Sequence, residues 1–241
     1  LYLADDALWP LSGALITAAT KPRIALSDKI NDAFRSAAEN YRNNFGWQVL
    51  FWPRGTMILV NVPSSTGSSQ QQYVMNSISG SWCRFTGVRA NCFEVYQGNI
   101  YYGGNGFVSR FWNTFADDGT QITGNAKQAF HYYRNKNLKQ FVMARPILQS
   151  NGSPAISFGV NTDYDDSNVL STLSFSPTTY AAWDSAIWDT DVWGGGLTVS
   201  RDWQNISGIG FCAAPRFRTQ ANGLEVRWQA TDILYKPGAV I

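Results

Sequence analysis

The chain has 241 residues, including 10 Trp, 11 Tyr and 14 Phe, and 19 basic against 17 acidic side chains give a formal net charge of +2. Such a balanced charge argues against a general nucleic-acid binder, which needs a concentrated basic face. No apolar run approaches the roughly 18 residues of a membrane span, so we predict no membrane partner.

The chain begins at Leu1 without a Met, in a pattern that looks like an interrupted strand and turn up to Trp9. This beginning indicates a fragment of a longer polypeptide. One segment then has helical periodicity, because apolar residues recur there at steps of three and four: Ile30, Ala33, Phe34, Ala37, Ala38, Tyr41 and Phe45. The stripe predicts an amphipathic helix packed on a sheet, with Ser27 as N-cap and Gly46 at C′.

Residues 47–52 and 57–62 are nearly all apolar and are joined through Pro53-Arg54-Gly55. We expect a hairpin that is covered on both faces, one of them by the helix. Short strands with turn signals follow over 72–112, and their rhythm predicts one β-propeller-like meander. A polar connector from Asp117 to Asn125 places the predicted domain boundary after residue 124.

The second predicted domain, 125–241, keeps a β pattern. Apolar and polar residues alternate over 224–229, which is typical of a strand with one buried face. Further strands are expected at 127–134, 139–148, 155–162, 170–176, 197–203, 209–219 and 224–235. The predicted fold class is therefore mainly β, with a propeller-like sheet, one inserted helix and a C-terminal β-sandwich.

Candidates for catalysis are few. The chain lacks a Gly-x-Ser-x-Gly elbow, and its single histidine, His131, lies in an aromatic run that favours a packed strand residue over a base. Cys83, Cys92 and Cys212 lack zinc-site spacing and are interpreted as free buried thiols, although Cys83 and Cys92 could face each other. We predict no enzyme activity, no cofactor and no metal site.

One acidic segment resembles the start of a calcium loop, with Asn161, Asp163 and Asp165 at alternate positions. However, its sixth position is Asp166 where the loop needs Gly, and its twelfth is Thr172 instead of Glu. A polar turn is favoured, and an irregular ion site stays open.

Three cations, Arg134, Lys136 and Lys139, are expected together on a hairpin-like tip between two strands. The tip is either a solvated turn or a surface that touches nucleic acid or an acidic neighbouring subunit.

Trp183, Trp188 and Trp193 recur every five residues, and the run ends in glycines 194–196. This step fits neither the 3.6 period of a helix nor the 2.0 period of a strand. We interpret the rings as a structural ladder that pins an irregular segment to a sheet. The alternative is a carbohydrate- or receptor-binding module with exposed tryptophans. A glycosidase is disfavoured because the chain has few glutamates to form a carboxylate pair.

Several segments together resemble structural proteins of tailed bacteriophages and prophages, especially short-tailed ones, of the tail-hub, nozzle and packaged-DNA-stabilisation kinds. They are WPLSG at 9–13, ALSDKI at 25–30, GWQV at 46–49, YVMN at 73–76, WCRFTG at 82–87, ANCFE at 90–94, WDxxxWDxxxWGGG at 183–196 and WQNISGIG at 203–210.

The resemblance implies a propeller-like platform with appended β domains, assembled as a ring around a DNA channel. The expected partners are other tail or portal-proximal subunits, further copies of the chain and non-specifically contacted DNA, with a monomer in isolation. The expected location is the virion, after synthesis in the bacterial cytoplasm.

Overall fold

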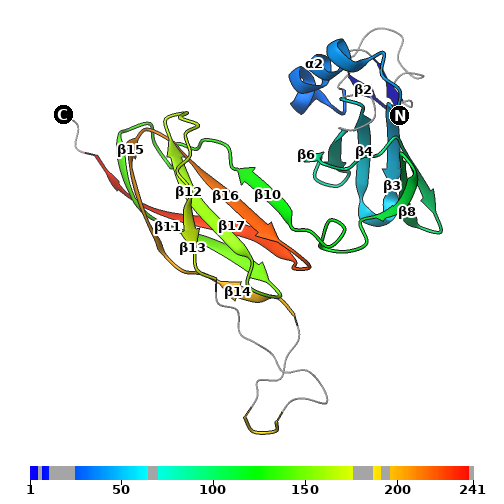
Figure 1. Ribbon diagram of the computed structural model, residues 1–241. Helices are drawn as coiled ribbons and strands as arrows, with labels where there is room; N and C mark the ends of the chain where they lie inside the picture. Colours follow the sequence, from blue (N-terminus) through cyan, green and yellow to red (C-terminus); the bar gives the residue numbers. More distant parts are fainter. Residues whose placement is uncertain (5–6, 11–24, 65–69, 176–186, 191–195, 239–241) are drawn as a thin grey trace. The chain divides into compact units, whose positions relative to one another are not determined.

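The computed structural model describes residues 1–4, 7–10, 25–64, 70–175, 187–190 and 196–238 (Figure 1). The predicted mainly β class is confirmed, and the chain divides into two compact units, Leu1–Asn113 and Thr114–Ile241. No helix in these ranges is long and apolar enough to cross a membrane.

The division between the units precedes the predicted boundary after residue 124. The connector belongs to the second unit because backbone and side-chain hydrogen bonds hold it there. Gly223 N donates to Phe115 O over 3.0 Å, and Asn222 Nδ2 donates to Gly119 O over 2.9 Å.

The first unit is built on a four-stranded antiparallel sheet, in the order β3 (Gln48–Trp52), β4 (Met57–Val62), β5 (Gln71–Asn76) and β6 (Trp82–Thr86). The predicted hairpin is confirmed, with the short 3₁₀ turn η2 (Pro53–Gly55) between β3 and β4. Every residue of β4 is buried, so this strand is covered on both faces as expected.

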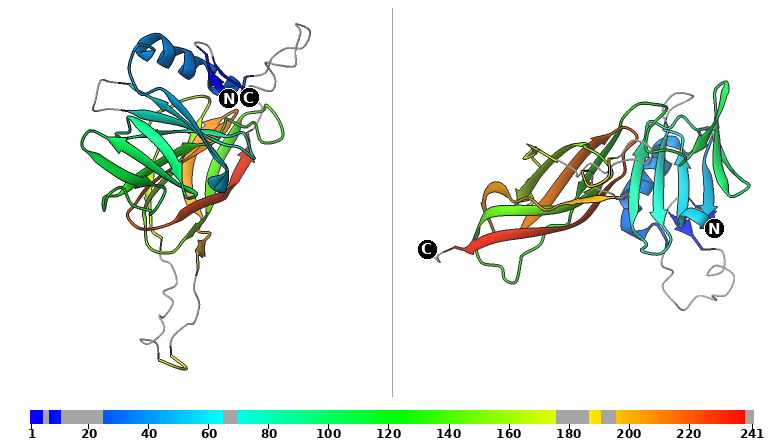
Figure 2. Two further views of the ribbon diagram at one scale, coloured as in Figure 1. Left: turned by 90° about the vertical axis from the view of Figure 1, so that its right-hand side faces the viewer. Right: turned by 90° about the horizontal axis from the view of Figure 1, so that it is seen from below.

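Helix α2 (Asn31–Tyr41) follows the turn η1 (Asp28–Ile30) and covers one face of this sheet (Figure 2). Its buried Phe34 and Ala37 share a core with Ile58 and Val60. The hairpin β1 (Tyr2–Leu3) and β2 (Leu8–Trp9) adds Leu8 to the same core.

Two details of the predicted helix are wrong. The Ser27 side chain does not cap the helix, because its Oγ instead accepts the amide hydrogen of Leu8 over 2.9 Å. The helix ends at Tyr41 with Arg42 as its C-cap, so Phe45 is exposed and Gly46 is not at C′.

The other face of the central sheet is covered by a separate three-stranded sheet of β7 (Cys92–Tyr96), β8 (Asn99–Gly104) and β9 (Phe107–Phe111). Phe93 and Ile100 pack there with Leu59 and Val74. The expected single meander over 72–112 is therefore wrong: β6 does not pair with β7. The chain folds back instead, because the apolar second face of β4 and β5 needs a cover.

The second unit contains two antiparallel sheets (Figure 1). In the first, the order is β10 (Ile122–Lys127), β16 (Ala213–Ala221), β12 (Ala155–Thr162) and β13 (Ser171–Leu173). In the second, β11 (Lys139–Ser150) pairs with β17 (Val226–Pro237) along one edge and with β15 (Gln204–Gly210) and β14 (Thr198–Ser200) along the other.

Both sheets of the second unit contribute to one core. Phe141 and Leu148 from β11 meet Ile156 and Phe158 from β12 and Phe217 from β16. The alternation over 224–229 is confirmed, because Val226 and Trp228 pack against this core while Arg227 and Gln229 are exposed. None of the sheets in the described ranges closes on itself.

Candidate functional site

The predicted basic tip lies in the segment between β10 and β11, but this segment is not the strand expected at 127–134. Its backbone runs beside β16, where Gln128 N donates to Pro215 O over 2.9 Å and His131 forms an isolated bridge with Ala213. Tyr133 and Arg134 then take φ of 44° and 81°. Two successive left-handed residues end any extended conformation, so the strand stops before the tip.

His131 is exposed, and its ring lies 4.9 Å from the ring of Tyr133 with its Nδ1 accepting the Tyr133 amide hydrogen. Among the described residues, the predicted aromatic packing of His131 is therefore found with the Tyr133 ring. Tyr133 itself lies deeper, and burial raises its pKa to about 12.

Lys139 does not belong to the exposed tip, contrary to the sequence expectation. Only 1% of it is exposed. Its Nζ donates to the carbonyls of Asn135 (2.6 Å), Asn137 (2.7 Å) and Phe211 (3.3 Å), and it lies 6.0 Å from the ring of Tyr235. The buried ammonium group thus stabilises the turn, because the three carbonyl groups accept the hydrogen bonds that water would otherwise accept.

Arg134 and Lys136 are exposed, as predicted. Within the described part of the chain, neither forms an ion pair within 4.0 Å. Lys136 Nζ lies 5.8 Å from the centre of the Tyr132 ring, within range of a cation–π contact. These two cations keep their charge available to a partner.

Beside them the structure assembles a surface that the sequence did not reveal. Lys127 Nζ lies 5.3 Å from the Phe130 ring, the rings of Phe130 and Tyr164 are 4.7 Å apart, and the hydroxyls of Tyr164 and Tyr132 are 3.4 Å apart. We call Lys127, Phe130, Tyr132, Lys136 and Tyr164 the aromatic platform. Tyr164 is 64% exposed.

Tyr164 lies in the segment that resembles the start of a calcium loop. The structure confirms the predicted polar turn there. Thr162 O accepts the Asp165 amide hydrogen over 2.9 Å, while Asp163 and Tyr164 take φ of 47° and 61°. Positive φ at both central residues is typical of a type I′ turn. Tyr164 therefore occupies a turn position at which Gly is favoured, and nothing in the sequence indicated this conformation.

The carboxylates of this turn have protein partners. Asp163 Oδ1 accepts the amide hydrogens of Phe211 (2.7 Å) and Cys212 (3.2 Å). Asp165 accepts from Ser167, and this hydrogen bond lowers the pKa of Asp165. No cluster of three or more possible metal ligands occurs among the described residues.

Asp166 belongs to the same turn and pairs with cations of β10 and β16. Its Oδ1 lies 2.7 Å from Lys127 Nζ and 4.0 Å from Arg216 Nη1. The hydrogen bond and the charge of Lys127 lower the pKa of Asp166, with a smaller contribution from Arg216.

Of the tryptophan run, the described residues include Trp188, while Trp183 and Trp193 lie outside them. Trp188 is 72% exposed, and the following Asp189 takes φ of 64°. The exposure of Trp188 does not support the expected structural ladder at this residue, and its role as an interaction residue stays a prediction.

A second exposed surface lies on the sheet of β15, β11 and β17, on the side away from the core. Ile209 (64% exposed) and Leu234 project there, and Met143 is the cross-strand neighbour of Leu234. Arg145 and Asp232 form an ion pair, and the guanidinium of Arg145 lies 4.8 Å from the Trp203 ring. We call Met143, Arg145, Trp203, Ile209, Leu234 and Asp232 the outer face.

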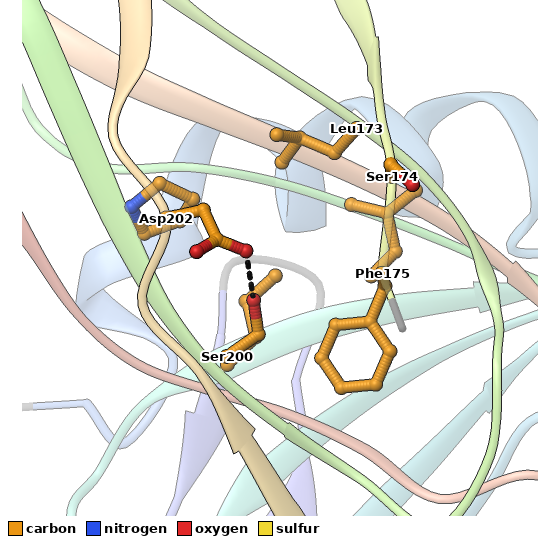
Figure 3. A pocket seen from close by; sticks show the side chains of 8 residues that line it. Leu173, Ser174, Phe175, Ser200 and Asp202 are labelled. Carbon is orange, nitrogen blue, oxygen red and sulfur yellow. Dashed lines mark hydrogen bonds between the residues drawn. The ribbon is translucent and has the colours of Figure 1, made fainter. Parts of the chain in front are cut away.

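A hollow between the two sheets of the second unit has a volume of only about 10 Å³. Figure 3 shows Ser200, which donates to Asp202 over 3.2 Å, opposite Phe175 and Leu173. Ligand pockets usually measure roughly 300–1,000 Å³. This hollow has room for about one water molecule, so it is a packing defect and not a substrate site.

The cysteines are free, as predicted, but only Cys212 is buried, and burial raises the pKa of its thiol. Cys83 and Cys92 are exposed, and they lie on β6 and β7, two strands in different sheets.

The described residues thus offer two surfaces for binding, the aromatic platform and the outer face. No protein-family model matches this chain, and no curated protein matches it in a sequence search.

Proposed function

We propose that this chain is a non-enzymatic structural component of a phage or prophage tail, of hub or nozzle type. In this role it packs against neighbouring virion subunits in a ring and helps to retain or conduct DNA. The C-terminal unit is then a β-sandwich whose outer surface meets another subunit. The phage assignment rests on the sequence resemblance, and the outer face is the structural observation that supports an assembly role.

The outer face has the chemistry of a protein interface. Exposed Ile209 and Leu234 lie on the same face of this sheet as the ion pair between Arg145 and Asp232, and Trp203 lies on the Arg145 guanidinium. Trp and Arg are enriched in the energetic centres of interfaces, and large apolar side chains exclude water around them. A subunit docked on this face would bury these groups together.

Complementation of a phage lacking this gene tests the assignment. We expect the wild-type chain to appear in purified particles by mass spectrometry, and the double variant Ile209→Lys/Leu234→Lys to be lost from them. The control is Phe45→Lys/Ile78→Lys, which changes two exposed apolar residues of the first unit. Wild-type chain absent from particles contradicts the phage role, and full incorporation of the first variant contradicts the role of the outer face.

A carbohydrate- or receptor-binding module is the alternative, and the exposure of Trp188 favours it. Planar rings at a surface can stack against sugar rings. Glycan binding that is lost in Trp188→Ala, with particle incorporation unchanged, would select this alternative.

A further inference from the structure

We propose that the aromatic platform is a binding site for single-stranded nucleic acid, with bases stacking on its tyrosine rings and phosphates pairing with its flanking cations. This site goes beyond the assembly role, since it assigns a ligand class to a surface distinct from the outer face. The proposed site and the proposed assembly role have in common only the expectation that DNA is nearby.

The order of groups along the platform carries the argument. Lys127 lies over Phe130, Phe130 packs on Tyr164, Tyr164 meets Tyr132, and Lys136 lies over Tyr132. A row of rings with a cation at each end is the arrangement by which proteins hold unpaired bases and their backbone. Every base offers a π-face, so such a row needs no sequence preference.

The charges around the platform favour an anionic ligand. Arg134 and Lys136 have no ion pair within the described residues, whereas Lys127 and Arg216 share the single carboxylate of Asp166. The opposing carboxylates are Asp165 and Asp166; Asp166 is engaged by Lys127, and Asp165 by Ser167. The remaining carboxylate, Asp163, is turned onto the amides of Phe211 and Cys212.

The backbone gives an independent reason. Tyr164 is exposed in a left-handed conformation, at a turn position where Gly or Asn is favoured. The Asp163 carboxylate holds this turn in place against Phe211 and Cys212. Strained backbone conformations of this kind cost conformational energy and are found mostly at functional sites, where they position a side chain. Here this conformation presents the Tyr164 ring beside Phe130 and Tyr132.

A duplex fits this surface less well, because its bases are stacked on each other and their flat faces are not accessible to the rings. A neutral sugar could stack on the rings but would leave Arg134 and Lys136 without a partner. The exposed Tyr164 ring, together with Arg134 and Lys136, which form no ion pair within the described residues, therefore favours a single strand.

Fluorescence anisotropy of a labelled oligothymidylate of about 12 nucleotides, a length within the usual range of such sites, tests the proposal with purified protein. Tyr164→Gly should weaken binding by about 5-fold to 150-fold, the range for loss of one stacked base. Because Gly suits a positive φ, this variant should fold as well as wild type. Lys136→Gln should lower the slope of log Kd against log salt by about 0.7, the value for one phosphate of a single strand.

Tyr96→Ala and Lys236→Gln are the matched controls, since Tyr96 is 62% exposed in the first unit and Lys236 is an exposed cation of β17. Both should bind like wild type. Absence of binding at low salt, equal effects of Tyr164→Gly and Tyr96→Ala, or equal competition by duplex or heparin would each overturn the proposal. These outcomes leave the particle-incorporation test untouched.

Discussion

The two units bury the apolar residues of their strands in different ways. In the first unit, β4 lies between a helix and a second sheet, so Ile58 faces one core and Leu59 the other. In the second unit, each sheet turns one face to a shared core, so Ile206 of β15 packs inward while Ile209 is exposed. The central strand β4 of the first unit is therefore buried along its whole length. In the second unit, β15 and β17 keep apolar residues such as Ile209 and Leu234 exposed, where a partner can bind them.

The largest expected effects come from changes on both faces of β4. Leu59→Ala and Ile58→Ala should each lower the free energy of unfolding of the first unit by about 2–5 kcal/mol, through lost burial and a residual cavity.

In β15 of the second unit, Ile206→Ala should lower the free energy of unfolding, whereas Ile209→Ala should change it by less than about 0.5 kcal/mol. Hydrogen exchange resolved by peptide during urea unfolding assigns each change to its unit. Equal losses of unfolding free energy in Ile206→Ala and Ile209→Ala would contradict the difference between the buried and exposed faces of β15.

The buried lysine of the second unit should give the next largest effect. Lys139→Met removes the donor to three carbonyls while keeping an unbranched side chain, and we expect a loss of about 2–4 kcal/mol. Lys136→Met, a change of an exposed lysine three positions earlier, should be nearly neutral. Chemical denaturation of both variants measures the difference, and similar stabilities would show that the Lys139 hydrogen bonds contribute little.

A side-chain amide fastens the two sheets of the first unit to each other. Gln48 Nε2 donates to Phe93 O and Gln48 Oε1 accepts from Phe93 N, each over 2.7 Å. Gln48→Leu should therefore cost about 1–3 kcal/mol, because both backbone groups of Phe93 lose their partner. Gln229→Leu, at an exposed amide of the second unit, is the control. Faster hydrogen exchange at Phe93 in the first variant alone would support this, and unchanged exchange there would refute it.

The smallest expected effect is the pH dependence of the pair between Asp166 and Lys127 in the second unit. The folded state has a lowered Asp166 pKa, so the stabilisation is present above the ordinary Asp pKa of about 3.9 and is lost as pH falls through the folded value. The urea midpoint of Asp166→Asn should therefore change less between pH 5 and pH 2.5 than that of wild type. A parallel change in both proteins would exclude a contribution from this pair.

Local patterns in the sequence predicted several parts correctly. The helix at 31–41, the hairpin of β3 and β4, and the alternation over 224–229 all appear, because each depends on a period set by backbone geometry. The turn at 161–166 was also predicted from its polar residues and its departures from a calcium loop.

The site depended on contacts that no local pattern contains. The aromatic platform joins Phe130 to Tyr164 across 34 residues of sequence, through a turn fixed by backbone amides of Phe211 and Cys212. The burial of Lys139 likewise needs the carbonyl of Phe211. A charged residue in a polar segment is normally solvated, so the polar residues before Lys139 led us to predict that its side chain is exposed.

The sequence alone was enough to predict the mainly β class, the helix at 31–41 and the strands that alternate or stay apolar, since these follow from periods of 2.0 and 3.6 residues. The tertiary structure decided that the 72–112 segment splits between two sheets, that Lys139 lies inside and that Tyr164 stands among rings and cations. The reason is that strands distant in sequence pair and pack so that the whole unit exposes little apolar area. How much area is buried depends on the packed layers together, so no single segment can predict it.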